Sequence, residues 1–385
     1  MKATAHRSPW LTDELDAVRD LARSFFTEEA APREEEFARQ GFPARELWRR
    51  AGALGLLCAS VPEEYGGGGG TIAHEIVLVE EQMTAGAGAM PMVVHSGIVA
   101  HYLNAYGTEE QRRRWLPRMA SGDLLGAVAM TEPGTGSDLQ SIRTRAVRSG
   151  DAYLVSGAKT FITNGRNAGL VVIAAKTDPA QGARGVSLLV AEVDDDTPGF
   201  TRGRVLPKIG QHSTDTVELF FDELRVPAGN LLGPREGLGF AQLMEQLPQE
   251  RLLIAAIGLA WLESAVHTTV AHTKQRQVFG QPLFALQNTR FELADCATTA
   301  RVARVFLDDC VERHLRGQLD AATASMAKYW ITDRQTEVVD RCLQLHGGYG
   351  YMAEYPIARI FTDGRVQRIY GGANEVMKEL VARSL

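Results

Sequence analysis

Cysteine pairs and runs of positive charge are both missing from this sequence. Its four cysteines, Cys58, Cys296, Cys310 and Cys342, lie far apart and form no Cys-x-x-Cys pair. A disulfide framework and a zinc site are therefore not indicated, and buried thiols in the helices of a cytosolic protein are expected. No run of Lys or Arg stands out, and the formal net charge is −6, so a nucleic-acid partner is not expected.

Signals for a membrane span, a leader peptide and a dinucleotide fold are missing too. No stretch reaches the roughly 18 consecutive apolar residues of a membrane span. The N-terminus, MKATAHRSPWLTDELDAVRDL, has no apolar leader segment, so a cytoplasmic location is expected. No Gly-x-Gly-x-x-Gly opens a helix, which argues against the usual dinucleotide-binding unit. At 385 residues, with 45% of them hydrophobic, the chain is long enough for several layers or domains.

The first of three regions, residues 1–122, has a helical pattern. Apolar residues at helical spacing predict one helix over Leu15–Phe25 and another near Ile72–Met83. The glycine run Gly66–Gly70 interrupts this region. Because no strand precedes the run and no Lys-Ser/Thr follows it, a flexible loop is predicted rather than a phosphate-binding loop.

A β-domain is predicted for residues 123–234, and long helices return in residues 235–385. The strands follow one another too closely for crossover helices, which favours an antiparallel sheet or small barrel and an α+β fold class. The predicted strands are Tyr153–Thr163, Leu170–Lys176, Val186–Val193 and Thr216–Val226. Two later helices each keep one apolar face, formed by Phe291, Ala294, Thr298, Val302 and Val305, and by Ala327, Ile331, Val338, Cys342 and Leu345. Gly347-Gly348 ends the second of them.

Three short blocks have ordinary explanations when each is taken alone. AMTEPGTGSDL, residues 129–139, combines turn-forming glycines with the hydroxyls of Thr131 and Ser137. KTFITNG, residues 159–165, places Phe161 in a strand, where an aromatic residue is usually part of the core. Arg276, three residues before Phe279-Gly280, could be a solvated charge at a helix end.

Together with the C-terminal stretch QLHGGYGYMAEYPIARIFTDGRVQRIYGGANEV, these blocks resemble the acyl-CoA dehydrogenase flavoproteins over nearly the whole chain. The order of helices, sheet and helices is similar to the fold of that family. The resemblance implies a bound FAD, and Ser137 also lies on the side of the CoA substrate. The residues that it assigns to the flavin are Met130, Thr131, Gly136, Ser137, Phe161 and Thr163.

The resemblance also implies that a neighbouring subunit completes each cofactor site. Arg276 would meet the pyrophosphate and Phe279 the adenosine half of an FAD bound to another copy, and a planar guanidinium suits a diphosphate. An obligate homo-oligomer, expected to be a tetramer, follows. Ala373 replaces the threonine usual in the family, which removes one possible cofactor hydrogen bond worth about 1 kcal/mol. Further cofactor contacts are assigned to Gln287, Gln344, Gly347, Gly348 and Glu375.

The catalytic glutamate that many members of the family carry near the C-terminus is missing here, and its absence indicates a subclass of the family. Many members carry a catalytic glutamate after the Ile-Tyr pair, and Gly371 stands at that position here. Removal of a proton α to a thioester needs a general base, whereas a glycine N–H can still polarise the carbonyl. In long-chain and isovaleryl relatives the base lies on an earlier helix before an arginine, which implies Glu250 in LPQERLL, with Arg251 and Tyr370 at the substrate. Without the resemblance, a glutamate in the first helical turn after a proline is explained by the helix dipole.

The function implied is the FAD-dependent conversion of an acyl-CoA thioester to trans-2-enoyl-CoA, with electrons passed to an electron-transferring flavoprotein, as in β-oxidation. Glu250 takes the α-proton and flavin N5 takes the β-hydride. Three alternatives stay open: a dehydrogenase of carrier-protein-bound or unusual short acyl groups, an oxidase or monooxygenase, and a non-catalytic flavin-binding homologue. Space near Gly371 makes branched acyl chains plausible. Exchanging the two positions, Gly371→Glu with Glu250→Gly, is expected to retain some dehydrogenation.

Overall fold

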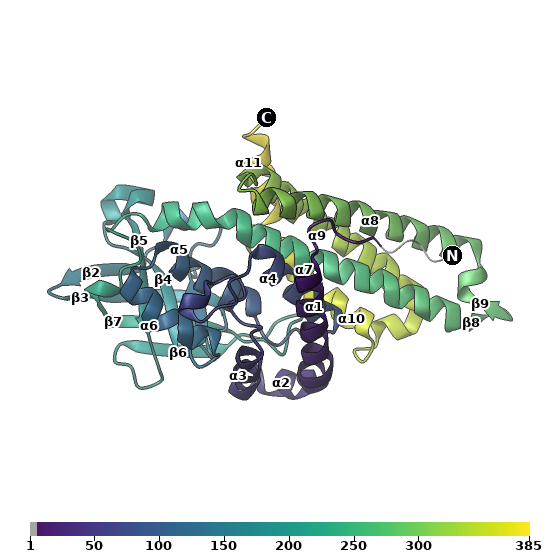
Figure 1. The fold of residues 1–385 in the computed structure, drawn as a ribbon, viewed down its shortest axis with the longest axis horizontal. Helices are drawn as coiled ribbons and strands as arrows, with labels where there is room; N and C mark the ends of the chain where they lie inside the picture. The colour runs from purple at the N-terminus through teal and green to yellow at the C-terminus, as the bar shows by residue number, and fades with distance from the viewer. Residues whose placement is uncertain (1–5) are drawn as a thin grey trace.

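The computed structural model describes residues 6–385 and places a β-sheet region between two helical regions along the chain (Figure 1). Residues 1–5, the start of the predicted leaderless N-terminus, lie outside the described residues. The two predicted helices of the first region are present as α1 and α4. Thr12 and Thr71 cap them, because their side chains accept hydrogen bonds from Leu15 N and Ala73 N. The helices of this region are α1 (Asp13–Phe25), α2 (Glu34–Gln40), α3 (Arg45–Ala53), α4 (Ile72–Thr84), α5 (His101–Tyr106) and α6 (Glu109–Ala120), with a π-helix, η4 (Val93–Ala100), before α5.

The sheet has seven strands and is mixed rather than purely antiparallel. Most neighbours pair antiparallel, as predicted, but β1 pairs with β4 in parallel. The first residue of β2, Arg145, also pairs with β4 in parallel. Because β2 and β3 intervene between β1 and β4, the connection is long enough for the crossover that parallel pairing needs. The strands are β1 (Gly126–Ala129), β2 (Arg145–Ser149), β3 (Ala152–Thr163), β4 (Leu170–Lys176), β5 (Val186–Glu192), β6 (Phe200–Val205) and β7 (Thr216–Pro227).

Strand β4 is buried on both faces, which explains its continuous apolar sequence. Leu170, Val172 and Ala174 pack in one cluster with side chains of α5 and α6. The alternate residues Val171, Ile173 and Ala175 pack in a second cluster with side chains of β3, β5 and β7. The sheet is therefore fixed against the first helical region through this strand.

The C-terminal region is built around α7, which packs against α4, α8 and α9. Among the described residues α7 is the one helix long and apolar enough to cross a membrane, but 67% of its apolar window is buried inside the fold, as in a core helix. Gly347, with φ of 59°, follows the last residue of α9, as predicted. The elements are α7 (Gly239–Gln275), β8 (Gln277–Val278), β9 (Gln281–Pro282), α8 (Gln287–Leu315), α9 (Ala321–His346), α10 (Pro356–Gly364) and α11 (Asn374–Ala382).

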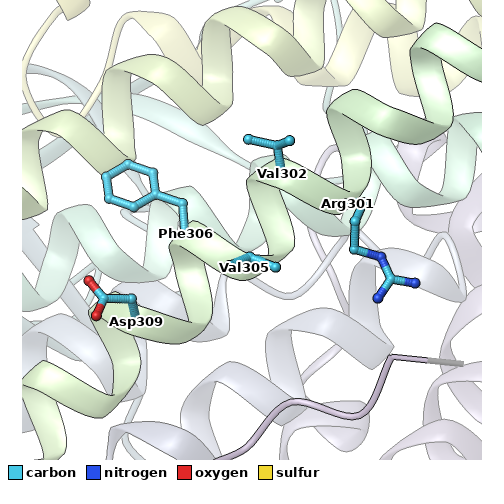
Figure 2. A pocket seen from close by; sticks show the side chains of 5 residues that line it. All are labelled: Arg301, Val302, Val305, Phe306 and Asp309. Carbon is cyan, nitrogen blue, oxygen red and sulfur yellow. The ribbon is translucent and has the colours of Figure 1, made fainter.

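Helix α8 has two apolar faces, and the predicted one is not covered by the rest of the chain. Phe291, Val302 and Val305 are 61%, 50% and 53% exposed. Figure 2 shows Val302, Val305 and Phe306 beside a shallow groove of about 440 Å³, with Arg301 and Asp309 also lining it. A helix with apolar residues on two faces can turn either one inward, and the face packed in the core carries Cys296, Ala300, Ala303 and Leu307.

The glycine run Gly66–Gly70 is closely packed, so the prediction of a flexible loop was wrong. Its backbone N–H groups donate to carbonyls of residues 58–63, including Gly68 N to Cys58 O at 3.3 Å and Gly70 N to Ala59 O at 2.9 Å. A Cβ on Gly67 would overlap the backbone of Val61. All four cysteines are free and buried, and Cys58 lies in the non-helical segment before this loop rather than in a helix.

Replacing Gly67 by alanine should lower the free energy of unfolding by about 1–3 kcal/mol, because the added methyl group must displace the Val61 carbonyl. Gly88→Ala is the matched control, since a Cβ there meets no atom within 4 Å. Thermal unfolding of the two variants measures the difference. Equal melting temperatures would show that the glycine run is not tightly packed.

Candidate active site

The two sequence blocks that contain Thr131 and Phe161 meet beside the ends of β1 and β3. Thr160 N donates to Thr131 O at 3.0 Å, and the Lys159 ammonium donates to Met130 O at 2.9 Å. Lys159 also forms a salt bridge of 2.9 Å with Glu132, and both side chains are buried. These contacts fix the loop after β1 relative to β3.

Glu132 is the second anchor of this loop, and the sequence analysis did not single it out. Its carboxylate accepts from the backbone N–H groups of Arg143 at 2.6 Å and Thr144 at 2.9 Å, besides its pair with Lys159. Burial lowers the pKa of Lys159 to about 8, against the opposing effect of Glu132. The sequence did contain a signal for this pair, because Glu132 and Lys159 are opposite charges in blocks that are otherwise apolar or turn-forming. A buried charge needs a partner, so the two could have been expected to pair.

The predicted flavin residues of these blocks lie on the loop after β1 and on the end of β3, which this loop contacts. Phe161 is 66% exposed and has φ of 58°, where β3 departs from regular register, so it is not the core residue that a strand aromatic usually is. A non-glycine residue in this left-handed conformation is strained and is typical of functional sites. Thr131 and Thr163 are half-buried, and Gly136 and Ser137 are exposed.

A second group of predicted cofactor residues lines one pocket of about 620 Å³, beside the β8–β9 hairpin. Arg276 faces it together with Gln344, Gly347 and Gly348. The two glycines leave open space at their Cβ positions. Phe279, at the hairpin tip, and Gln287, at the start of α8, are exposed outside this pocket, and Glu375 lies apart from it, at the start of α11.

Aromatic rings and nitrogen donors give this pocket its chemistry. His272 and His346 stack with ring centroids 4.2 Å apart, and the Arg276 guanidinium lies 5.5 Å from the Tyr349 ring centroid. His272 Nε2 is buried without a hydrogen-bond partner in the described part of the chain. A guanidinium, open glycine backbone and flat rings together suit a diphosphate joined to a planar base.

The two groups lie far apart within one chain. In Figure 1 the sheet lies at one end of the long axis and the β8–β9 hairpin at the other. Helix α7 carries Glu250 near its start and ends at Gln275, beside Arg276. At 1.5 Å per residue, Glu250 and Arg276 are separated by about 39 Å along the helix.

Glu250 belongs to a third group of predicted site residues, which lies on α7 and on the segment before α11. It is 3% exposed, and its Oε1 accepts a hydrogen bond of 2.5 Å from the Tyr102 hydroxyl. Burial raises the pKa of Glu250, while the Tyr102 hydrogen bond opposes that rise. Because α7 begins at Gly239, Glu250 is not in its first turn, and the helix dipole does not account for a glutamate there.

Arg251 points away from Glu250, as adjacent helical residues must. Its Nη1 donates to Ser325 Oγ of α9 at 3.2 Å, and the side chain is buried. On α9 the buried Lys328 ammonium donates to Gly372 O at 2.7 Å and to Asn374 Oδ1 at 2.8 Å. Burial lowers the pKa of Lys328 to about 7. Lys328 and Asn374, which the sequence analysis did not identify, thus anchor the segment that contains Gly371.

Gly371 has φ of 61°, and Ile254 fills the space that a side chain there would need. A Cβ built on Gly371 would overlap Ile254 Cδ1. Ile254 lies one helical turn after Glu250, so both project from the same face of α7. A glutamate at position 371 would have to displace Ile254 Cδ1 and adopt a left-handed backbone, and the expected exchange of Gly371→Glu with Glu250→Gly stays a prediction. Tyr370, the predicted substrate neighbour, precedes Gly371 and is partly buried.

Family models match nearly the whole chain. The acyl-CoA dehydrogenase N-terminal domain matches residues 12–123, the middle domain 127–224 and the C-terminal domain 237–385. The mitochondrial long-chain specific acyl-CoA dehydrogenase of Rattus norvegicus is 45% identical over 376 residues, which cover 97% of this chain and 87% of that relative. This chain belongs to the acyl-CoA dehydrogenase family.

Solved structures agree with this membership. The acyl-CoA dehydrogenase from Geobacillus kaustophilus is 46% identical and has a TM-score of 0.95, with coverage of 98% of this chain and 99% of that one. A chain in a structure described as the electron transferring flavoprotein of Acidaminococcus fermentans is 35% identical, with a TM-score of 0.92 and coverage of 97% and 98%. The predicted family and its helical, β and helical domains are confirmed.

As an acyl-CoA dehydrogenase, the protein is an oxidoreductase that acts on CH–CH bonds and uses FAD. The residues present fit that cofactor. The exposed Phe161 and the loop hydroxyls suit a flat ring system, and the pocket with Arg276 suits a dinucleotide.

Gly371→Ala should reduce both activity and stability, because the methyl group meets Ile254 Cδ1 and the backbone is left-handed. The backbone strain alone is of order 1–3 kcal/mol. Adding Ile254→Val removes the Cδ1 atom and should recover part of the loss, while Ile254→Val alone costs about 0.5–1.5 kcal/mol. Turnover and thermal unfolding of the three variants test this. If the double variant is no better than Gly371→Ala, the packing of Ile254 is not the cause.

Proposed function

We propose that this acyl-CoA dehydrogenase converts an acyl-CoA thioester to trans-2-enoyl-CoA with Glu250 as the general base. The observation that carries the proposal is a buried carboxylate on the same face of α7 as Ile254, which packs on Gly371. Burial raises the pKa of Glu250 toward the working range of a general base. No side chain at position 371 competes for this role.

The chain's own groups divide the work at the reacting carbons. Glu250 removes the α-proton, and it does so as the ionised carboxylate, which the Tyr102 hydrogen bond favours. The backbone N–H of Gly371 donates to the thioester oxygen as negative charge develops there. Lys328 holds the carbonyl of Gly372 and so keeps that N–H in place. Bound FAD supplies the hydride acceptor.

Long-chain acyl-CoA is the substrate class that we propose first, because a relative 45% identical is long-chain specific. A dehydrogenase of carrier-protein-bound or unusual short acyl groups is the second candidate. A panel of straight and branched acyl-CoA thioesters and acyl-carrier proteins, with an artificial electron acceptor, separates the two. We further propose an electron-transferring flavoprotein as the natural acceptor, since a structure described for such a protein contains a similar chain.

We also propose that two copies of the chain build each cofactor site. The flavin residues near Phe161 and the pocket around Arg276 lie toward opposite ends of one molecule (Figure 1). A second copy can bring its Arg276 pocket to the first copy's sheet. The uncovered apolar face of α8, with Phe291, Val302 and Val305, supplies a further surface for assembly into a tetramer.

Glu250→Gln should keep FAD bound and reduce turnover by roughly 10²–10⁴-fold, because the amide cannot accept the α-proton. The matched control is Glu245→Gln, which removes an exposed carboxylate from the same helix and should retain near-normal turnover. In the wild type, kcat/KM should fall as the pH drops through the raised pKa of Glu250. Normal turnover by Glu250→Gln would place the base elsewhere.

Mixed oligomers test the shared cofactor site. One variant carries Arg276→Ala, and the other carries Phe161→Ala with Thr163→Ala, so each should bind FAD poorly alone. In a mixed pair, the intact flavin half of the first variant meets the intact dinucleotide half of the second. Co-expression should therefore restore FAD and activity at up to half of the sites in each mixed pair. If each chain built its own site, co-expression would give no more than the sum of the two variants.

A further inference from the structure

The carboxylate of Glu250 has one hydrogen-bonding side chain near it in the described part of the chain, and that side chain is fully buried. The Tyr102 hydroxyl lies 2.5 Å from Glu250 Oε1, and Tyr102 is 0% exposed. Its ring packs in the cluster that contains Trp115 and Leu116. Both partners are thus held away from bulk water, where a hydrogen bond to a charge is strong.

The backbone just before Tyr102 is fixed against α7. Gln246 of α7 bonds His101 at 2.5 Å, and Gln249 Nε2 donates to Gly97 O at 3.2 Å. Tyr102 is the second residue after the π-helix η4, a rare conformation that often occurs at functional sites. These contacts leave the Tyr102 hydroxyl with little freedom to move away from Glu250.

We propose that Tyr102 is a positioning residue that orients the Glu250 carboxylate toward the reacting carbon and keeps it ionised. The proposal rests on Glu250 being the general base. A phenol hydroxyl can donate to a carboxylate but does not compete for the α-proton, because burial keeps the pKa of Tyr102 well above its ordinary value. The donated hydrogen bond favours the charged form of Glu250 and so opposes the effect of burial.

Few other charges bear on Glu250. Arg251, on the same helix, attracts the ionised carboxylate but donates its hydrogen bond to Ser325. Many charged and titratable side chains on the elements packed against α7 bond to other groups, among them Glu75, Glu80 and Glu81 on α4, His95 on η4, His101 on α5 and Lys328 on α9. Tyr106 of α5 donates to Glu245, and His314 of α8 lies near His101. Tyr102 is therefore the group whose removal should change the ionisation of Glu250 most.

The experiment is the pH dependence of kcat/KM for Tyr102→Phe, with the acyl-CoA that the wild type turns over fastest and an artificial electron acceptor. Phenylalanine keeps the buried ring and loses the hydroxyl. The acid limb should move up by roughly one to two pH units, the effect of losing a hydrogen bond to a charged group. Well above the shifted limb, the rate should stay below that of the wild type, because the carboxylate is no longer oriented, and the FAD content should not change.

Tyr106→Phe is the matched control, because Tyr106 lies one turn further along α5 and donates to Glu245 at 2.8 Å rather than to Glu250. Its acid limb should coincide with that of the wild type. A second variant has 3-fluorotyrosine at position 102, whose more acidic hydroxyl is a stronger donor. It should move the acid limb in the opposite direction, to lower pH, and it still tests the proposal if Tyr102→Phe does not fold.

The possible outcomes separate this proposal from the proposed function. An unchanged acid limb in Tyr102→Phe, with Glu250→Gln inactive, would overturn the role of Tyr102 and leave the base in place. Normal turnover by Glu250→Gln would overturn both. Equal shifts in Tyr102→Phe and Tyr106→Phe would also count against the proposal, since they would indicate a general disturbance of α5.

Discussion

One contact shapes the segment before α11: Ile254 Cδ1, at the end of a side chain of α7, lies where a Cβ at position 371 would be. Because Ile254 and Glu250 project from one face of α7, the residue that excludes a carboxylate at position 371 belongs to the same helix as the proposed base. The left-handed backbone at Gly371 adds a second reason for glycine, since other residues are strained there. A glycine at position 371 thus fits both the packing of α7 and the backbone conformation there.

Two buried ammonium groups hold the backbone on either side of the proposed chemistry. Lys159 joins the loop after β1 to Glu132 and Met130, and Lys328 joins α9 to the segment of Gly372 and Asn374. Each is removed from water, and for each burial lowers the pKa. Such groups cost free energy to bury unless their hydrogen bonds are satisfied. Each of the two ammonium groups donates two hydrogen bonds, and these bonds fix the positions of the two segments.

Local patterns predicted the fold where burial is unambiguous. The run Leu170–Lys176 is a strand over the predicted residues because both of its faces are buried, and α4 and α9 follow their apolar periodicity. Helix α8 shows where such patterns fail: it has two apolar faces, and only packing decides that Val302 and Val305 stay uncovered. The parallel pairing of β1 with β4 and the tight packing of Gly66–Gly70 depend on residues distant in sequence or on backbone contacts. The contact of Tyr102 with Glu250 also depends on residues distant in sequence, since the two lie 148 positions apart.

Helix α7 connects the region of the proposed base, Glu250, with the pocket that contains Arg276. It carries Glu250 in its first half, and its last turn leads into Arg276, with a buried core helix between them. A continuous helix packed on three others is stiff, so the distance between these two residues is fixed by the fold. If a neighbouring copy contributes the Arg276 pocket, each α7 takes part in two cofactor sites, one through Glu250 and one through its C-terminal end. Assembly then becomes a condition for catalysis, because no movement within one chain can bring the two halves together.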